Sequence, residues 1–118
     1  MTVTLRELKE SLGLTLLTES ADMSRAVEAG YCCDLLSWVL ARGVSGMAWI
    51  TVQTHMNAVA VATLLDMSCL ILPEDIQPEP DTLARAAEEG VAVFVSRDNA
   101  YALCGKMRAM GVPAAAKA

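Results

Sequence analysis

The sequence predicts an α/β domain whose mostly parallel sheet is flanked by helices on both faces, in three layers. Two features of the pattern predict it: short apolar runs alternate with helical segments four times, and these runs lack a polar face. Strands that are apolar on both sides belong to parallel sheets that helices cover. The length of 118 residues, without an internal repeat or a linker, indicates one domain over residues 1–118.

The first element is predicted as a helix within residues 1–13. Thr4 and Glu7 have the spacing of a capping box, in which the hydroxyl and the carboxylate bind free amides at the helix start. The apolar stripe of this helix recurs at Leu5, Leu8 and Leu12. Gly13 then suits the left-handed conformation that ends a helix.

The segment after this helix predicts one strand and a weakly patterned stretch. Residues 14–18 form a short apolar, β-tolerant run and are predicted as the first strand. Residues 19–30 alternate without a clear period, so we expect only a short edge strand there, near Ala26 and Val27.

The helix predicted over residues 32–41, which ends at Gly43, is apolar around more than half of its circumference. The residues responsible are Leu35, Leu36, Trp38, Val39 and Leu40. Such a helix is either deeply buried or a surface for a partner. Large, rigid side chains concentrate binding energy, which makes Leu35, Trp38 and Leu40 the candidate interface residues.

Three further buried strands are predicted at residues 47–52, 69–72 and 91–95. Each is a continuous apolar run of strand length. A helix rich in alanine and valine is expected over residues 58–62, and its small side chains permit close approach to the sheet. Residues 73–80 carry three prolines and three acids and are predicted as a loop.

Two helices complete the pattern. Asp81 is expected to cap the first of them, and Gly90 to end it. Its shared inner face consists of Leu83, Ala86 and Ala87. Asp98 or Asn99 is expected to cap the last helix, and residues 113–118 to form a frayed tail. The inward stripe of the last helix consists of Ala100, Leu103, Cys104 and Met107.

Composition and charge exclude several classes of partner. The formal net charge of −5 leaves no basic footprint for nucleic acid. No apolar run reaches the roughly 20 residues that cross a bilayer, and the charged N-terminus has no signal-peptide core, so we expect a cytoplasmic protein without a membrane partner. The cysteines at positions 32, 33, 69 and 104 form no C-x-x-C pair and are expected as buried, reduced thiols.

Polar residues follow the predicted strands where a parallel sheet opens its ligand crevice, beyond the carboxyl ends of the strands. The candidate ligand-binding residues are Thr51, Gln53, Thr54, His55, Asn57, Ser96 and Arg97. Free amides at a helix start attract a phosphate, and Arg97 offers an anion a cation. The simpler alternative is that Thr54 only caps the helix and Arg97 is solvated. Glu74 and Asp75 are expected to be solvated, with Mg²⁺ beside a nucleotide as the alternative.

Signatures of catalysis are absent from the sequence. There is no G-x-x-x-x-G-K-[ST], no G-x-G-x-x-G, no G-x-S-x-G and no metal-binding motif, and the single histidine has no nucleophile beside it. We therefore expect a protein that is not an enzyme, with no catalytic residues, no metal and no cofactor. An enzyme would need a partner chain to complete its site.

The middle of the chain carries distinctive strings at residues 31–39 (YCCDLLSWV) and 49–62 (WITVQTHMNAVAVA), which continue at 80–91 and 102–111. These strings together resemble small stand-alone DRTGG-domain proteins. Such proteins resemble the N-terminal domain of HPr kinase/phosphorylase and are described as serine-kinase-like. The resemblance implies a Rossmann-like fold and a regulatory or scaffolding role, often at a dimer contact, without kinase activity. It also implies association with hydrogenase and NADH-linked redox enzymes.

The sequence departs from this family at the motif that names it. Leu72-Pro73-Glu74-Asp75 stands where a Thr-Gly-Gly turn follows the third main strand, and Thr54-His55 stands where an Asp-Arg pair opens the preceding helix. A proline and two carboxylates oppose the approach of a phosphate to the backbone.

Two functions remain open from the sequence. The first is a non-catalytic regulatory or accessory module that acts through protein–protein contacts, as a homodimer or with a larger enzyme. The alternative is a sensor that binds a nucleotide or a phosphorylated metabolite, such as an acyl phosphate, at the carboxyl edge of the sheet.

Overall fold

Five strands form the central sheet, in the order β2-β7-β6-β5-β4. The structure is a computed structural model, which describes residues 2–19 and 21–116. The strands are β2 (Thr15–Leu16), β4 (Ala29–Cys32), β5 (Met47–Ile50), β6 (Cys69–Leu72) and β7 (Ala92–Val95). Strands β4 to β7 are parallel, and only β2 runs antiparallel to its neighbour β7. A separate two-stranded sheet pairs β1 (Val3–Thr4) with β3 (Ala26–Val27).

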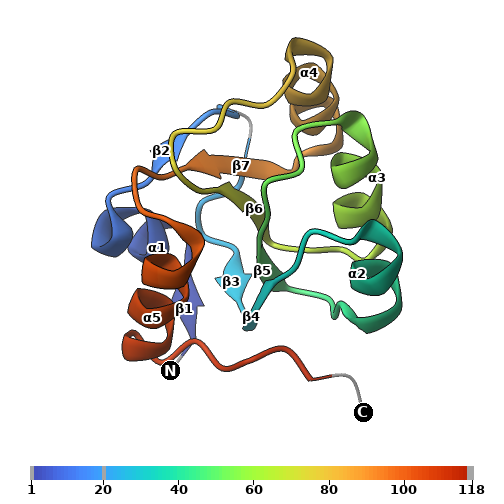
Figure 1. Ribbon diagram of the computed structural model, residues 1–118. Helices are drawn as coiled ribbons and strands as arrows, with labels where there is room; N and C mark the ends of the chain where they lie inside the picture. Colours follow the sequence, from blue (N-terminus) through green and yellow to red (C-terminus); the bar gives the residue numbers. More distant parts are fainter. Residues whose placement is uncertain (1, 20, 117–118) are drawn as a thin grey trace.

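Helices cover both faces of the sheet, which gives the predicted three-layer, Rossmann-like α/β fold (Figure 1). They are α1 (Leu5–Leu12), α2 (Leu36–Arg42), α3 (Met56–Leu64), α4 (Pro80–Glu89) and α5 (Ala100–Ala109). Strands β4, β5, β6 and β7 lie side by side in the sheet in the order in which they follow along the chain. The connections between them all have the same handedness, so α2, α3 and α4 lie on the same face. Helices α1 and α5 cover the other face, so each side has its own apolar core.

The three central strands explain why the fold class is readable from the sequence. Every residue of β5, β6 and β7 is buried, as continuous apolar runs predict for strands covered on both sides. The capping box of α1 is confirmed: Thr4 Oγ1 accepts from the amide of Glu7, and Glu7 Oε1 accepts from the amide of Thr4. Gly13 and Gly90 end α1 and α4 in the left-handed conformation, also as predicted.

The predicted helix over residues 32–41 is wrong at its start. Residues 29–32 instead form β4, the edge strand that pairs in parallel with β5, and α2 begins only at Leu36. Of the three residues between them, Cys33 and Asp34 bind the end of β5 through the Cys33 amide and the Asp34 carboxylate. Tyr31 and Cys32 therefore belong to a strand, and Cys32 is exposed rather than buried.

Two smaller expectations are also corrected. Asp81 does not cap α4: the residue before the helix is Glu79, which makes no side-chain cap bond, and Pro80 occupies the first turn, where its missing N–H costs nothing. The predicted frayed tail is ordered as far as Ala115, because Gly30 of β4 donates its N–H to the Pro113 carbonyl and accepts from the Ala115 amide. Residues 117 and 118 of that tail lie outside the described part of the chain.

The described helices are short. The longest contain 10 residues, and none in the described part of the chain is long and apolar enough to cross a membrane.

Candidate functional site

The carboxyl ends of β4, β5, β6 and β7 meet at one edge of the sheet, and four loops gather there. They are residues 33–35, 51–55, 73–79 and 96–99. In Figure 1 these loops lie toward the viewer and the top, between α5 on one side and α2 and α3 on the other. All seven residues predicted as ligand-binding lie in or directly after these loops.

Asp34 organises the loops after β4 and β5, although the sequence did not single it out. Its Oδ1 accepts from the Thr51 hydroxyl at 2.8 Å and from the Val52 amide at 2.9 Å. Its backbone carbonyl accepts from Nε2 of Gln53 at 2.6 Å. Thr51 is only 1% exposed, so its hydroxyl has no access to water. The polar donors that were candidates for a ligand at the end of β5 therefore already bind Asp34.

The start of α3 is capped by His55, not by Thr54. His55 Nδ1 accepts from the amide of Asn57 at 3.2 Å, and His55 holds the extended conformation of a cap residue. Thr54 instead uses its carbonyl oxygen, which accepts from the amide of Glu79 at 3.2 Å. The expectation that Thr54 caps this helix was wrong, since imidazole nitrogen takes the acceptor role that a hydroxyl usually fills.

Ser96 and Asn99 shape the loop after β7. The buried Ser96 hydroxyl oxygen accepts from the Asp98 amide, and Asn99 Oδ1 accepts from the Ala102 amide and caps α5. Asp98 also forms an ion pair with Lys106 at 2.7 Å. Arg97 and Asn99 are the exposed residues of this loop, and Arg97 is its only cation.

The acidic loop after β6 makes the tight turn that glycines would favour. Glu74 and Asp75 have φ of 57° and 56°, and the Ile76 amide donates to the Pro73 carbonyl at 3.1 Å. Two consecutive left-handed residues inside such a bond form a type I′ turn. This conformation costs roughly 1–2 kcal/mol for an ordinary L residue and is free for glycine. The turn is thus present without the Thr-Gly-Gly residues, and it presents two carboxylates.

The structure brings the predicted site residues together in two groups rather than one. Thr51 and Gln53 are joined through Asp34 at the end of β5. Ser96 accepts from the Asp75 amide through its carbonyl at the end of β7. Because β6 separates β5 from β7, the two groups lie two strands apart, about 10 Å. Among the described residues, no group of three His, Cys, Asp or Glu side chains is placed to hold a metal ion.

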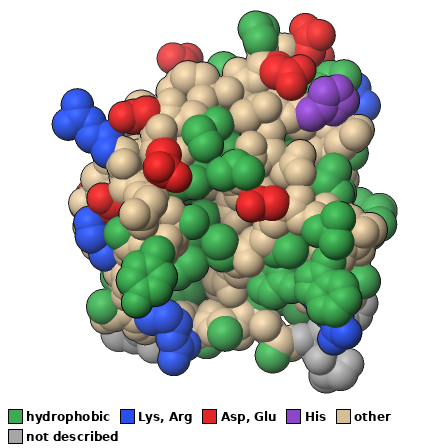
Figure 2. Space-filling view, viewed as in Figure 1, with side chains coloured by type: hydrophobic (Ala, Val, Ile, Leu, Met, Phe, Trp, Pro, Cys, Tyr) green, Lys and Arg blue, Asp and Glu red, His purple; other side chains and the backbone are tan. Residues whose placement is uncertain are grey.

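Helix α2 presents large apolar side chains to solvent. Leu35, Trp38 and Leu40 are 63%, 48% and 41% exposed, while Val39 anchors the helix in the core. Leu35 is the residue directly before α2 and lies three residues, less than one turn, ahead of Trp38 on the same side, whereas Trp38 and Leu40 point about 160° apart at about 100° per residue. The Arg42 guanidinium lies 4.6 Å from the centre of the Trp38 ring. Figure 2 shows hydrophobic side chains gathered over α2, beside a basic group.

A cavity of about 280 Å³ lies between β4, α5 and the segment that follows α5. Its wall is almost entirely apolar and includes Tyr31, Cys32, Ile50, Cys104, Met107 and Arg108. Partial burial, followed by the neighbouring Cys104 thiol, raises the pKa of the Cys32 thiol to about 11. The sequence did not predict this cavity, because residues 29–31 were assigned to no element and Cys32 was placed at the start of a helix.

Comparison with known proteins finds a similar fold among the solved structures. No family model matches the chain, and no curated protein matches it significantly. A crystal structure of the CBS and DRTGG domains of the regulatory region of Clostridium perfringens pyrophosphatase, in complex with the activator diadenosine tetraphosphate, resembles it with a TM-score of 0.74 at 11% identity. The match covers 97% of this chain and 50% of that one, so the chain spans half the length of that region. At this identity the likeness establishes the fold, and the resemblance to HPr kinase/phosphorylase stays a prediction.

Proposed function

We propose that this protein is a non-catalytic regulatory module that acts through protein–protein contact, as a homodimer formed by α2. The observation that carries the proposal is the exposure of Leu35 and Trp38 on the same side of α2. The likeness in fold to part of a regulatory region supports the regulatory role. The resemblance seen in the sequence extends the proposal to a larger partner enzyme, with hydrogenase and NADH-linked redox enzymes the first to test.

The chemistry of α2 favours a second copy of the chain as the occupant. The whole helix, Leu36–Arg42, carries a single charged residue, Arg42, whose guanidinium already lies over the Trp38 ring. Two copies that meet around a two-fold axis therefore bring no row of like charges together, although the chain has a net charge of −5. Tryptophan is the side chain most enriched among residues that dominate binding energy.

The first prediction concerns self-association. Wild-type protein is expected to sediment as a dimer at tens of micromolar, and Trp38→Ala to shift the equilibrium to monomer, because each protomer loses roughly 2 kcal/mol of contact energy. Leu35→Ala is expected to act in the same direction. Analytical ultracentrifugation over a concentration series measures both.

Leu40→Ala is the matched control, since Leu40 is exposed to a similar degree but points away from Trp38. It should leave the dimer intact. A strictly monomeric wild type, or equal weakening by Leu40→Ala and Trp38→Ala, contradicts the proposal.

A second candidate function is a sensor for a nucleotide or an acyl phosphate at the carboxyl edge of the sheet. Two observations favour it: the structure with the similar fold is a complex with diadenosine tetraphosphate, and Arg97 is an exposed cation beside the buried Ser96. Opposing it are the carboxylates of Asp34, Glu74, Asp75 and Asp98 in the same loops.

The second prediction separates these functions by thermal shift. A ligand at a hundredfold its Kd stabilises the folded state by about 2.7 kcal/mol. If the sensor function holds, ATP, diadenosine tetraphosphate or acetyl phosphate raises the melting temperature of wild type, and Arg97→Ala abolishes the increase. The double variant His55→Ala, Asn57→Ala tests whether the start of α3 contributes to ligand binding. Only the increase in melting temperature that the ligand causes is compared with that of wild type. No shift with any of the three ligands removes the sensor.

A further inference from the structure

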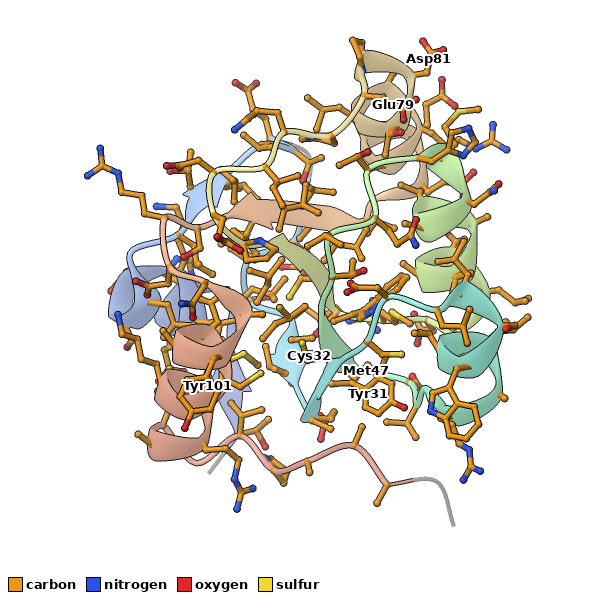
Figure 3. All side chains as sticks on the ribbon, in the orientation of Figure 1. Tyr31, Cys32, Met47, Glu79, Asp81 and Tyr101 are labelled. Carbon is orange, nitrogen blue, oxygen red and sulfur yellow. The ribbon has the colours of Figure 1, made fainter. Side chains whose placement is uncertain are left out.

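Successive residues of β4 face opposite sides of the sheet, and the side on which Gly30 and Cys32 lie is the one that α5 covers. The evidence for Gly30 is direct: a Cβ built on it would lie 3.0 Å from Cε of Met107 and 3.5 Å from Cγ1 of Val112. Cys32 is two residues further along the strand, so it points to the same face, about 6.6 Å nearer the carboxyl edge. Figure 3 shows Cys32 on β4 with α5 facing it across the cavity.

Helix α5 places Cys104 level with Cys32 along the direction of the strands. The helix follows β7 and runs back across the sheet, opposite to the direction of the parallel strands. Cys104 precedes Met107 by three residues, which moves it about 4.5 Å toward the carboxyl edge. The step from Met107 to Cys104 and the step from Gly30 to Cys32 therefore run in the same direction, so Cys104 lies opposite Cys32. Both thiols line the same cavity, and Cys104 lies close enough to Cys32 to raise the pKa of the Cys32 thiol.

We propose that Cys32 and Cys104 form a redox-sensitive thiol pair that a low-molecular-weight disulfide oxidises to one intramolecular disulfide bond between β4 and α5. The cavity opens to solvent, and Cys32 is the exposed member of the pair, so a small disulfide reaches it first. Cys104 is half-buried behind it and acts as the resolving thiol. The proposal does not depend on the α2 dimer.

The exchange proceeds in two balanced steps. Cys32 loses its proton and attacks one sulfur of the small disulfide, which forms a mixed disulfide and releases the first small thiolate. Cys104 then loses its proton and attacks the Cys32 sulfur, which forms the internal bond and releases the second thiolate. The two thiolates take up the two protons. Two protein thiols are oxidised, and one small disulfide is reduced to two thiols.

The rate of the first step is expected to depend steeply on pH. The pKa of Cys32 is raised to about 11 by partial burial and by the Cys104, Asp34 and Cys33 groups around it, and Arg108 is the basic residue of the cavity. Since the thiolate is the nucleophile and the pKa lies well above neutrality, the rate should increase about tenfold per pH unit from about pH 7 to 9.

The experiment treats the full-length protein with oxidised glutathione, quenches free thiols and maps the peptides without reduction. Wild type and Cys33→Ser, the matched control for an adjacent thiol, are expected to give a Cys32–Cys104 disulfide. Cys104→Ser is expected to stop at a glutathione adduct on Cys32, and Cys32→Ser to give no internal bond. If a serine variant does not fold, the wild-type peptide map at pH 7, 8 and 9 and the Cys104→Ala variant still test whether the Cys32–Cys104 disulfide forms.

Three results would overturn the proposal. The first is a glutathione adduct on Cys32 that persists in wild type as long as in Cys104→Ser. The second is a Cys32–Cys33 or intermolecular disulfide in place of the internal one. The third is a rate of the first reaction that does not change with pH.

Discussion

Trp49→Ala is expected to lower the free energy of unfolding by about 3–5 kcal/mol, a large part of the total stability of a small domain. Trp49 lies on the central strand β5, is fully buried and packs in the core beneath α2, α3 and α4. Its Nε1 also donates to the Cys33 carbonyl at 2.8 Å, which ties the loop after β4 to β5. Urea denaturation followed by circular dichroism measures the loss.

Two further tryptophan variants provide the controls. Trp49→Phe keeps most of the buried volume and removes the hydrogen bond, so it should cost only about 1–3 kcal/mol. Trp38→Ala, which removes a half-exposed ring from the surface of α2, should change the stability of the monomer much less. If Trp49→Ala unfolded at nearly the same urea concentration as wild type, the described packing of β5 would be incorrect.

Asp34→Ala is expected to lower the free energy of unfolding by about 1–3 kcal/mol, because it leaves the buried Thr51 hydroxyl and the Val52 amide without their acceptor. Asp34→Asn retains an acceptor oxygen and should cost clearly less. The same denaturation experiment compares the two variants.

A double-mutant cycle with Thr51→Val isolates the hydroxyl–carboxylate contact. In the Thr51→Val background the orphaned donor is absent, so Asp34→Ala should cost less than it does in wild type. Strict additivity of the two substitutions would show that Asp34 does not bind Thr51.

The elements that were predicted correctly depend on local chemistry. The strands β5, β6 and β7 are apolar on both faces, and α1 carries its own cap in Thr4 and Glu7. These signals lie within a few consecutive residues, so they can be read without knowing the rest of the chain.

The elements that were missed depend on distant contacts. Residues 29–32 contain no β-branched side chain, and their strand conformation comes from pairing with β5 on one side and with the segment after α5 on the other. Because the predicted helix began at Cys32, Asp34 fell inside it and its role at the end of β5 was hidden. The left-handed conformations of Glu74 and Asp75 were equally unreadable, because residues other than glycine seldom adopt them, even though aspartate does so more often than most.

The residues after α5 have a consequence for the behaviour of the protein in concentrated solution. A strand at the border of a sheet offers unpaired amides and carbonyls that recruit strands from other molecules and seed aggregation. Here Pro113 and Ala115 occupy both backbone groups of Gly30 on that border. This short segment thereby keeps strands of other molecules from pairing with β4. It includes a proline, which has no N–H to donate to a further strand.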